Sequence, residues 1–241
     1  MIKQISTAVN NLTNNYEKSI LTDKFNRFHN YLRISITERC NLRCSYCMPE
    51  QGLDLTNKDE LLSMSEYNRL IDLFCKLGVT KVRLTGGEPL VNNNCVSIIN
   101  EISKYTKNIG ITTNGLVLKN KIKDLKEAGM SSVNISLDTL IEAKFNFITK
   151  RQGLNKVTES IFLAQDLYKS EFELNKKLFD SINYNKALHY NVKVNCVVIK
   201  NFNHDEIINM IEYLTKDFYI DLRFIEFMPF ADNSKNSLYS I

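Results

Sequence analysis

Residues 33–50 read RISITERCNLRCSYCMPE. Together with the two residues before it, the first part of this stretch alternates apolar and polar side chains over residues 31–37, which predicts a β-strand. The loop that follows contains three cysteines in the spacing C-x3-C-x2-C, at Cys40, Cys44 and Cys47. The stretch therefore predicts a strand that leads directly into a loop able to bind a metal through thiolates.

The three clustered thiols favour an iron–sulfur cluster over a structural zinc site. Structural zinc is usually held by four ligands in two pairs, but this chain has no second CxxC pair and its three histidines are scattered. Three thiolates on a [4Fe–4S] cluster leave one iron open to an outside ligand, and an open metal position is typical of a catalytic site. A zinc-binding loop that borrows a distant fourth ligand is the alternative interpretation.

Outside this stretch, segments with a strand pattern alternate with segments of helical periodicity. The predicted strands are residues 31–37, 79–84, 109–113, 132–137, 192–199 and 221–227. The first predicted helix begins at a capping box of Ser63 and Glu66 and ends at Gly78; later helices are expected over 94–105, 118–128, 156–168 and 204–216. This alternation predicts an α/β fold of parallel βα units, and a partial (βα)6 barrel and a doubly wound sheet both satisfy it.

Composition indicates a globular protein from a reducing compartment. The chain has 241 residues, of which 44% are hydrophobic and 24% charged. Its size and its clustered thiols argue against a secreted disulfide framework. The net charge of +4 permits an anionic ligand but gives no argument for nucleic acid, and no apolar run approaches the roughly 18–20 residues that a membrane-spanning helix needs.

The chain is expected to consist of a core with two flanks. Residues 1–30 form a polar extension whose first 16 residues lack acidic residues, as transit peptides do, but also lack arginine. This gives a weak signal for a mitochondrial leader, with the cytoplasm as the alternative location. Residues 31–230 form the core, in which the charged, Asn-rich segment 169–190 predicts a surface insertion, and residues 231–241 form a short tail.

Basic residues in or beside the predicted strands indicate an anionic substrate. These residues are Arg33, Lys81, Arg83, Lys193 and Arg223. Residues two apart in a strand share a face, so cations from several strands meet in one cavity and repel one another unless an anion fills it. A nucleoside triphosphate supplies that charge, and arginine suits bidentate contact with phosphate. The alternative is that these cations pair with carboxylates or lie at strand ends in water.

The chain resembles the radical S-adenosylmethionine (SAM) superfamily and, within it, the MoaA-type GTP 3′,8-cyclases of molybdenum cofactor biosynthesis, most closely their eukaryotic A-type members. The resemblance rests on six tracts in order: residues 33–50, 81–90 (KVRLTGGEPL), 111–115 (ITTNG), 134–140 (NISLDTL), 192–198 (VKVNCVV) and 223–229 (RFIEFMP). It extends from about residue 21 to residue 230 and is interrupted by 169–190. It implies a partial (βα)6 TIM-like barrel.

The resemblance also implies the ligands of each site. Cys40, Cys44 and Cys47 would hold a catalytic [4Fe–4S] cluster whose free iron binds SAM. Positions that match SAM contacts in the family are Tyr46, Gly87, Ser136, Asn195 and Met228. Positions that match GTP contacts are Arg33, Arg83, Thr112 and Lys193, and the charge argument adds Lys81 and Arg223. Taken singly, each of these residues also fits a structural role.

The implied reaction removes a hydrogen from C3′ of GTP, after which C3′ bonds to C8 of the base; an electron donor is required. Family members contain a C-terminal region with a second cluster that binds the guanine, and Cys75, Cys95 and Cys196 are expected to be buried apolar residues rather than its substitutes. We therefore expect SAM cleavage here, whereas positioning of the guanine needs such a region or a partner chain that supplies it. The next pathway enzyme is a further expected partner. A radical SAM enzyme for another substrate and a non-catalytic metal-binding module are the alternatives.

Overall fold

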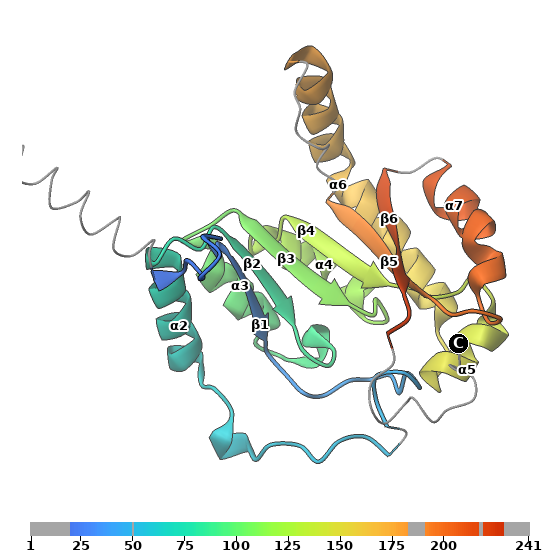
Figure 1. Ribbon diagram of the computed structural model, residues 1–241, viewed down its shortest axis with the longest axis horizontal. Coiled ribbons are helices and arrows are strands. Elements are labelled where there is room, and N and C mark those ends of the chain that lie inside the picture. The colour runs from blue at the N-terminus through green and yellow to red at the C-terminus, as the bar shows by residue number, and fades with distance from the viewer. Residues whose placement is uncertain (1–19, 50, 183–190, 217–218, 229–241) are drawn as a thin grey trace, which may run out of the picture.

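A six-stranded sheet forms the centre of the molecule. The computed structural model describes residues 20–49, 51–182, 191–216 and 219–228 (Figure 1). The strands are β1 (Tyr31–Ser35), β2 (Lys81–Thr85), β3 (Asn108–Thr113), β4 (Ser132–Ser136), β5 (Val192–Val198) and β6 (Ile220–Glu226). They are all parallel and lie in chain order, β1 to β6. A doubly wound sheet reverses its order at a switch point, so the open sheet of a partial (βα)6 barrel is confirmed.

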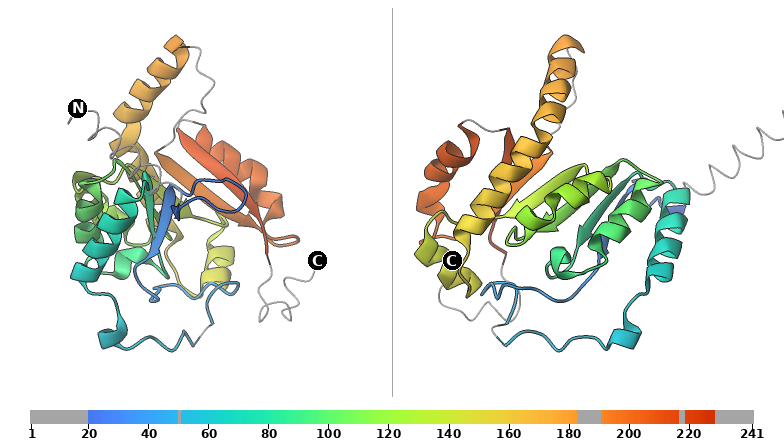
Figure 2. Two further views of the ribbon diagram at one scale, coloured as in Figure 1. Left: turned by 60° about the vertical axis from the view of Figure 1, so that its left-hand side comes forward. Right: turned by 180° about the vertical axis from the view of Figure 1, so that it is seen from behind.

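Helices cover one face of this sheet. They are α2 (Met64–Lys76), α3 (Cys95–Ser103), α4 (Ile122–Glu127), α5 (Glu142–Thr149), α6 (Leu154–Ile182) and α7 (Ile207–Thr215). Short 3-10 helices are η1 (Lys58–Glu60), η2 (Pro89–Val91), η3 (Leu118–Asn120) and η4 (His204–Glu206). Seen from behind, most of the helices lie in front of the strands, whereas the other face of the sheet is turned to the viewer of Figure 1 (Figure 2).

The helix-covered face of the sheet contains the apolar core. Alternate strand residues point to it and are fully buried: Val82, Leu84, Ile109, Ile111, Val133, Ile135 and Val194. They belong to one cluster with apolar residues of the helices, including Ile71, Ile98, Leu125, Val157 and Met210. Burying each such side chain stabilises the fold by about 1.5–3 kcal/mol. The period-two pattern of the strands thus separates an apolar layer from a polar face.

The predicted capping box is present at the start of α2. The Ser63 hydroxyl accepts a hydrogen bond from the Glu66 backbone N–H at 3.3 Å, and the Glu66 carboxylate accepts one from the Ser63 N–H at 2.8 Å. After α2, Gly78 has φ +106°, which a residue with a Cβ adopts only with strain. Both ends of this helix therefore follow local sequence signals.

Two helical elements differ from expectation. Helix α6 does not end near residue 168 but continues to Ile182, so residues 169–182 of the expected 169–190 insertion are helical. The extension is held by tertiary contacts: the Tyr168 hydroxyl donates to the Met130 carbonyl at 2.6 Å, and the buried Phe172 stacks on Tyr219. Helix α5 was not predicted; it is short and buries Phe145 and Ile148. Residues 183–190, the tail 231–241 and residues 1–19 of the extension lie outside the described residues.

Among the helices of the described part, none combines the length and the apolar character that crossing a membrane requires.

Removing a central core side chain should destabilise the whole fold. Ile111 in β3 is fully buried, so Ile111→Ala should lower the free energy of unfolding by about 2–5 kcal/mol, since a cavity replaces packed atoms. Ile208→Ala is the matched control because Ile208 is 62% exposed on α7, and it should change stability by no more than about 0.5 kcal/mol. Urea denaturation of both variants measures the difference; equal losses would contradict this core assignment.

Candidate functional site

The polar face of the sheet is arranged in tiers by the parallel register. The carboxyl-end tier contains Ser136, Asn195 and Arg223. The middle tier contains Thr112, Asn134, Lys193 and Asp221. The next tier towards the amino end contains Arg33, Arg83, Gly110 and Ser132. The last tier, at the amino end, contains Tyr31, Lys81 and Asn108. Successive tiers are about 6.6 Å apart, because a strand rises about 3.3 Å per residue.

All six residues predicted to bind the anionic substrate therefore lie on one face. The glycine at position 110 confirms that neighbouring side chains meet there: a Cβ added to Gly110 would stand 3.0 Å from both Arg83 Nη2 and Ser132 Oγ. Arg33 and Arg223 are on the edge strands and are exposed, whereas Arg83 is buried. Lys81 and Lys193, which also lie on inner strands, are half-buried.

Arg83 is fixed by neighbours on the same face. Its Nε donates to the Tyr31 hydroxyl at 2.6 Å, and its Nη1 donates to the Ile111 carbonyl at 3.3 Å and the Thr112 hydroxyl at 3.4 Å. These contacts are all to neutral groups, so they hold the guanidinium without neutralising it. The ammonium of Lys81 lies 4.7 Å from the centre of the Tyr31 ring, a cation–π contact that likewise leaves its charge in place.

Lys193 and Arg223 share a single carboxylate. Asp221 lies 3.7 Å from the Lys193 ammonium and accepts from Arg223 at 2.6 Å. Burial lowers the pKa of Lys193, and Arg223, Lys81 and Arg83 lower it further, whereas Asp221 raises it. Three cations and one carboxylate thus act on this ammonium, and an anionic ligand would relieve the excess of positive charge.

Binding of an anion on this face should therefore be coupled to the uptake of a proton. At alkaline pH a lysine of lowered pKa has partly lost its proton. Binding of inorganic tripolyphosphate should raise the pKa of Lys193, so the protein should take up a proton when the anion binds. The uptake should grow as pH rises towards the restored pKa. Isothermal titration calorimetry in buffers of different ionisation enthalpy measures it. Lys193→Arg keeps the charge but does not titrate, so equal uptake by that variant would contradict the assignment.

The cysteine loop lies at the carboxyl end of the sheet. It leaves β1 and passes along the lower edge of the strands towards α5 (Figure 1). The Arg43 N–H donates to the Thr149 carbonyl at 2.9 Å, and the Ser45 N–H donates to the Ile148 carbonyl at 3.0 Å. The loop is therefore anchored to the end of the helix that sequence patterns did not predict.

The three thiols lie on this one loop without forming a closed metal site. The Cys44 and Cys47 thiols share a hydrogen bond, which raises the pKa of Cys44 and lowers that of Cys47. The Cys40 sulfur accepts from the Leu42 N–H at 3.4 Å, and burial raises the pKa of its thiol. Among the described residues no three His, Cys, Asp or Glu side chains stand together in a ready metal-binding arrangement. The donor set, three soft thiols within eight residues, fits iron–sulfur chemistry.

Gly87 packs backbone against backbone with the start of the cysteine loop. Its N–H donates to the Thr37 carbonyl at 2.7 Å, and an added Cβ would lie 2.4 Å from the Arg39 carbonyl oxygen and 2.5 Å from that of Glu38. Only glycine fits there, because those atoms are main chain. The glycine tract therefore sets the position from which the loop departs.

Glu88, which sequence reasoning did not single out, connects this tract to the loop. Its carboxylate is 1% exposed and accepts from the Thr113 hydroxyl and the Asn114 N–H, both at 2.7 Å. The Asn114 side chain in turn donates to Asn41 Oδ1 at 2.7 Å, between two of the cysteines. Burial raises the pKa of Glu88, and these donors oppose the rise.

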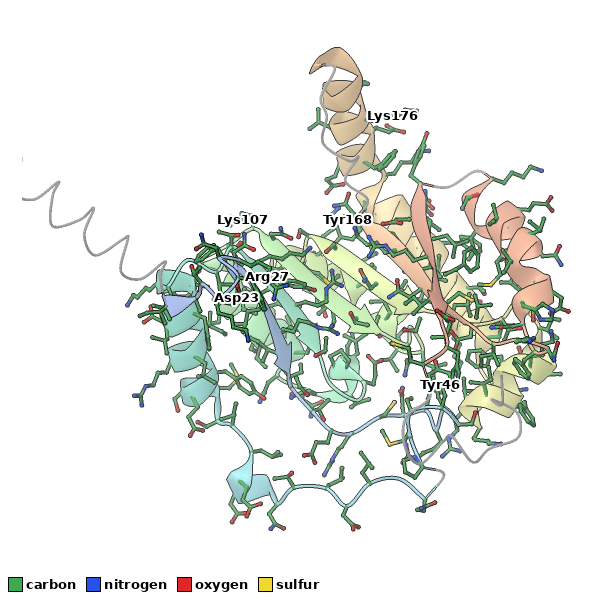
Figure 3. All side chains as sticks on the ribbon, viewed as in Figure 1. Asp23, Arg27, Tyr46, Lys107, Tyr168 and Lys176 are labelled. Carbon is green, nitrogen blue, oxygen red and sulfur yellow. The ribbon has the colours of Figure 1, made fainter. Side chains whose placement is uncertain are left out.

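Asp138 is a second buried carboxylate that the sequence did not reveal. It accepts from the Tyr46 hydroxyl at 2.7 Å and from the Val197 N–H at 2.8 Å, which connects the cysteine loop to β5. Burial raises the pKa of Asp138, and burial together with Asp138 raises that of Tyr46. Figure 3 shows Tyr46 at the end of the sheet beneath β6. The hydroxyl of this predicted cofactor contact thus holds the loop in place.

The structure gathers only some of the predicted cofactor contacts. Ser136, Cys44 and Tyr46 line one small cavity with Asp138 and Asn114. Asn195 is level with Ser136 and its buried Oδ1 has no partner within the described part of the chain. Met228 lies past the end of β6, is 66% exposed and does not line this cavity. The ligand roles of these residues stay predictions.

Tyr31, Asn134 and Asp221 were missed on the polar face. Each stands two residues before a residue that was predicted, namely Arg33, Ser136 and Arg223. Period-two alternation alone places them on the same face, so the signal was present in the sequence.

Comparison with known proteins identifies the family. The model of the radical SAM superfamily matches residues 34–214. The chain is 49% identical over 230 residues to the mitochondrial GTP 3′,8-cyclase of Arabidopsis thaliana, covering 95% of this chain and 54% of that protein. It is 43% identical over 214 residues to the GTP 3′,8-cyclase of Syntrophomonas wolfei, covering 88% and 59%. The chain thus spans little more than half the length of these relatives.

The fold is shared with a solved structure. Methylornithine synthase (PylB) superposes with a TM-score of 0.57 at 15% identity, covering 83% of this chain and 53% of that one. At this identity the likeness concerns the fold alone. The ordered parallel sheet, the cysteine loop at its carboxyl end and the match over residues 34–214 agree. The chain belongs to the radical SAM superfamily.

Proposed function

We propose that this chain forms the radical SAM core of a GTP 3′,8-cyclase that acts in the first step of molybdenum cofactor biosynthesis. The observation that carries the proposal is the arrangement of the sheet, with a cysteine loop at its carboxyl end and an excess of positive charge on the tiers below it. The names of the Arabidopsis and Syntrophomonas relatives support GTP as the substrate. The name of the Arabidopsis protein also supports a mitochondrial location.

The residues around the loop fit a [4Fe–4S] cluster and SAM. Cys40, Cys44 and Cys47 would hold the cluster, which when bound supplies the electron that cleaves SAM to methionine and the hydrogen-abstracting 5′-deoxyadenosyl group. Ser136 and the unpartnered Asn195 Oδ1 lie at the same end of the sheet and offer polar contacts to SAM.

Residues of the polar face would orient the nucleotide. Arg83 and Lys193 bind the triphosphate through charge and hydrogen bonds, which fixes the sugar towards the carboxyl end of the strands. The Tyr46–Asp138 and Asn114–Asn41 hydrogen bonds keep the loop at a constant position above them. With SAM and the cluster bound, C3′ would lose a hydrogen atom to the 5′-deoxyadenosyl carbon and would then bond to C8. Two electrons and one proton from an outside donor balance the reaction, one electron for SAM cleavage and the other, with the proton, to complete the cyclised nucleotide.

The assignment of the cluster ligands is tested by exchange of one thiol. Cys44→Ser should abolish the visible absorbance of the chain after anaerobic reconstitution with iron and sulfide, together with its conversion of SAM to 5′-deoxyadenosine, because serine is a poor ligand for this iron. Cys75→Ser, at a half-buried thiol on α2, is the control and should retain both. Retention of absorbance by Cys44→Ser would refute the ligand set.

The substrate assignment is tested separately from the cofactor. Arg83→Ala should weaken GTP binding by roughly 10- to 100-fold, because it removes a charge-assisted contact worth about 1.5–3 kcal/mol. SAM cleavage should persist within a few fold, since Arg83 is two tiers below Ser136. Arg69→Ala, an exposed arginine of α2, should leave both unchanged. Equal loss of GTP binding and SAM cleavage would mean that Arg83 has a different role.

A further inference from the structure

Asn134 of β4 stands on the polar face with an unmet hydrogen-bonding group. Its side chain is 7% exposed, and its Oδ1 is buried with no partner among the described residues. An unpaired buried acceptor costs about 1–3 kcal/mol. Such an atom on the substrate face indicates a donor that arrives with a ligand.

In the structure, two charged donors of the polar face contact groups other than Asn134. Lys193, the register neighbour of Asn134 on β5, directs its ammonium to Asp221. Arg83 directs its guanidinium to Tyr31 and the end of β3. The acceptor of Asn134 is therefore left for the ligand, although cations surround it.

The position of Asn134 in the tiers indicates which part of the ligand its side chain contacts. One step towards the carboxyl end is Ser136, beside the cysteine loop; one step towards the amino end is Ser132, level with Arg83. Each step is about 6.6 Å. In a nucleotide whose phosphates lie at the level of Arg83 and whose C3′ faces the loop, the sugar lies between Arg83 and the loop, which is the level of Asn134.

The chemistry of the acceptor agrees with that position. Phosphate oxygens accept hydrogen bonds and donate none at neutral pH, so they cannot satisfy Oδ1. A ribose hydroxyl donates one. We propose that Asn134 is a specificity-determining residue that accepts a hydrogen bond from a ribose hydroxyl of the bound nucleotide and thereby selects ribonucleotides. This inference rests on the proposed function and adds to it the part of the substrate that is recognised.

The test compares GTP with 2′,3′-dideoxy-GTP, which lacks both sugar hydroxyls. The full chain should bind GTP roughly tenfold more tightly, as expected for one buried hydrogen bond. In Asn134→Ala this ratio should fall to about one, through weaker GTP binding with little change for the dideoxy nucleotide. Asn134→Asp keeps an acceptor at the same place, so it should retain the ratio while its added charge weakens both nucleotides.

The matched control is Asn68→Ala, because Asn68 on α2 also has a buried Oδ1 without a partner in the described residues. It should keep the wild-type ratio, and thermal unfolding confirms that each variant is folded. A ratio that survives in Asn134→Ala, or a wild-type chain with no preference, overturns the inference and leaves the proposed function standing. If Asn134→Ala weakens the binding of GTP and of 2′,3′-dideoxy-GTP equally, the residue has a structural role and the inference is overturned. A wild-type chain that binds neither nucleotide overturns the proposed function and this inference with it.

Discussion

The parallel register of the six strands is the constraint on which the rest of the molecule depends. It pairs residues of equal parity across the sheet, so one face collects the apolar residues and the other collects the polar ones. The apolar face is sealed by helices and supplies the stability of the fold. The polar face carries more cations than carboxylates around Lys193. Repulsion between these cations destabilises the free protein, and burial of the apolar core offsets this cost. Conflict of this kind between local electrostatics and stability is typical of functional sites.

The cysteine loop has no helix or strand of its own and is held by contacts from other elements, which include α5 and the ends of the strands. Gly87 meets its start through main-chain atoms, Asn114 holds Asn41 between the cysteines, and Asp138 holds Tyr46. The two carboxylates that organise these contacts, Glu88 and Asp138, are buried and accept from backbone N–H groups. These contacts, rather than the sequence of the loop alone, therefore set the position of the loop relative to the tiers.

Local patterns sufficed for the strands, the first helix cap and the shared face of the cations, because period-two alternation and capping are properties of neighbouring residues. They did not give the strand order, which follows from pairing between distant segments. They also missed α5 and the extension of α6, which depends on Phe172 meeting Tyr219. Asp138 escaped notice because its partner Tyr46 is 92 residues away. Asn134 carries no charge, so the charge argument did not include it, although period-two alternation places it on the same face.

We propose that the polar face holds GTP so that its C3′ lies towards the cysteine loop at the carboxyl end of the sheet. The most direct measurement is mass spectrometry of the 5′-deoxyadenosine formed when the iron-loaded chain is given SAM, a reductant and GTP deuterated at C3′. The account predicts 5′-deoxyadenosine that contains one deuterium from the nucleotide. Formation of 5′-deoxyadenosine without deuterium while GTP is bound, or no 5′-deoxyadenosine from an iron-loaded chain, would contradict it.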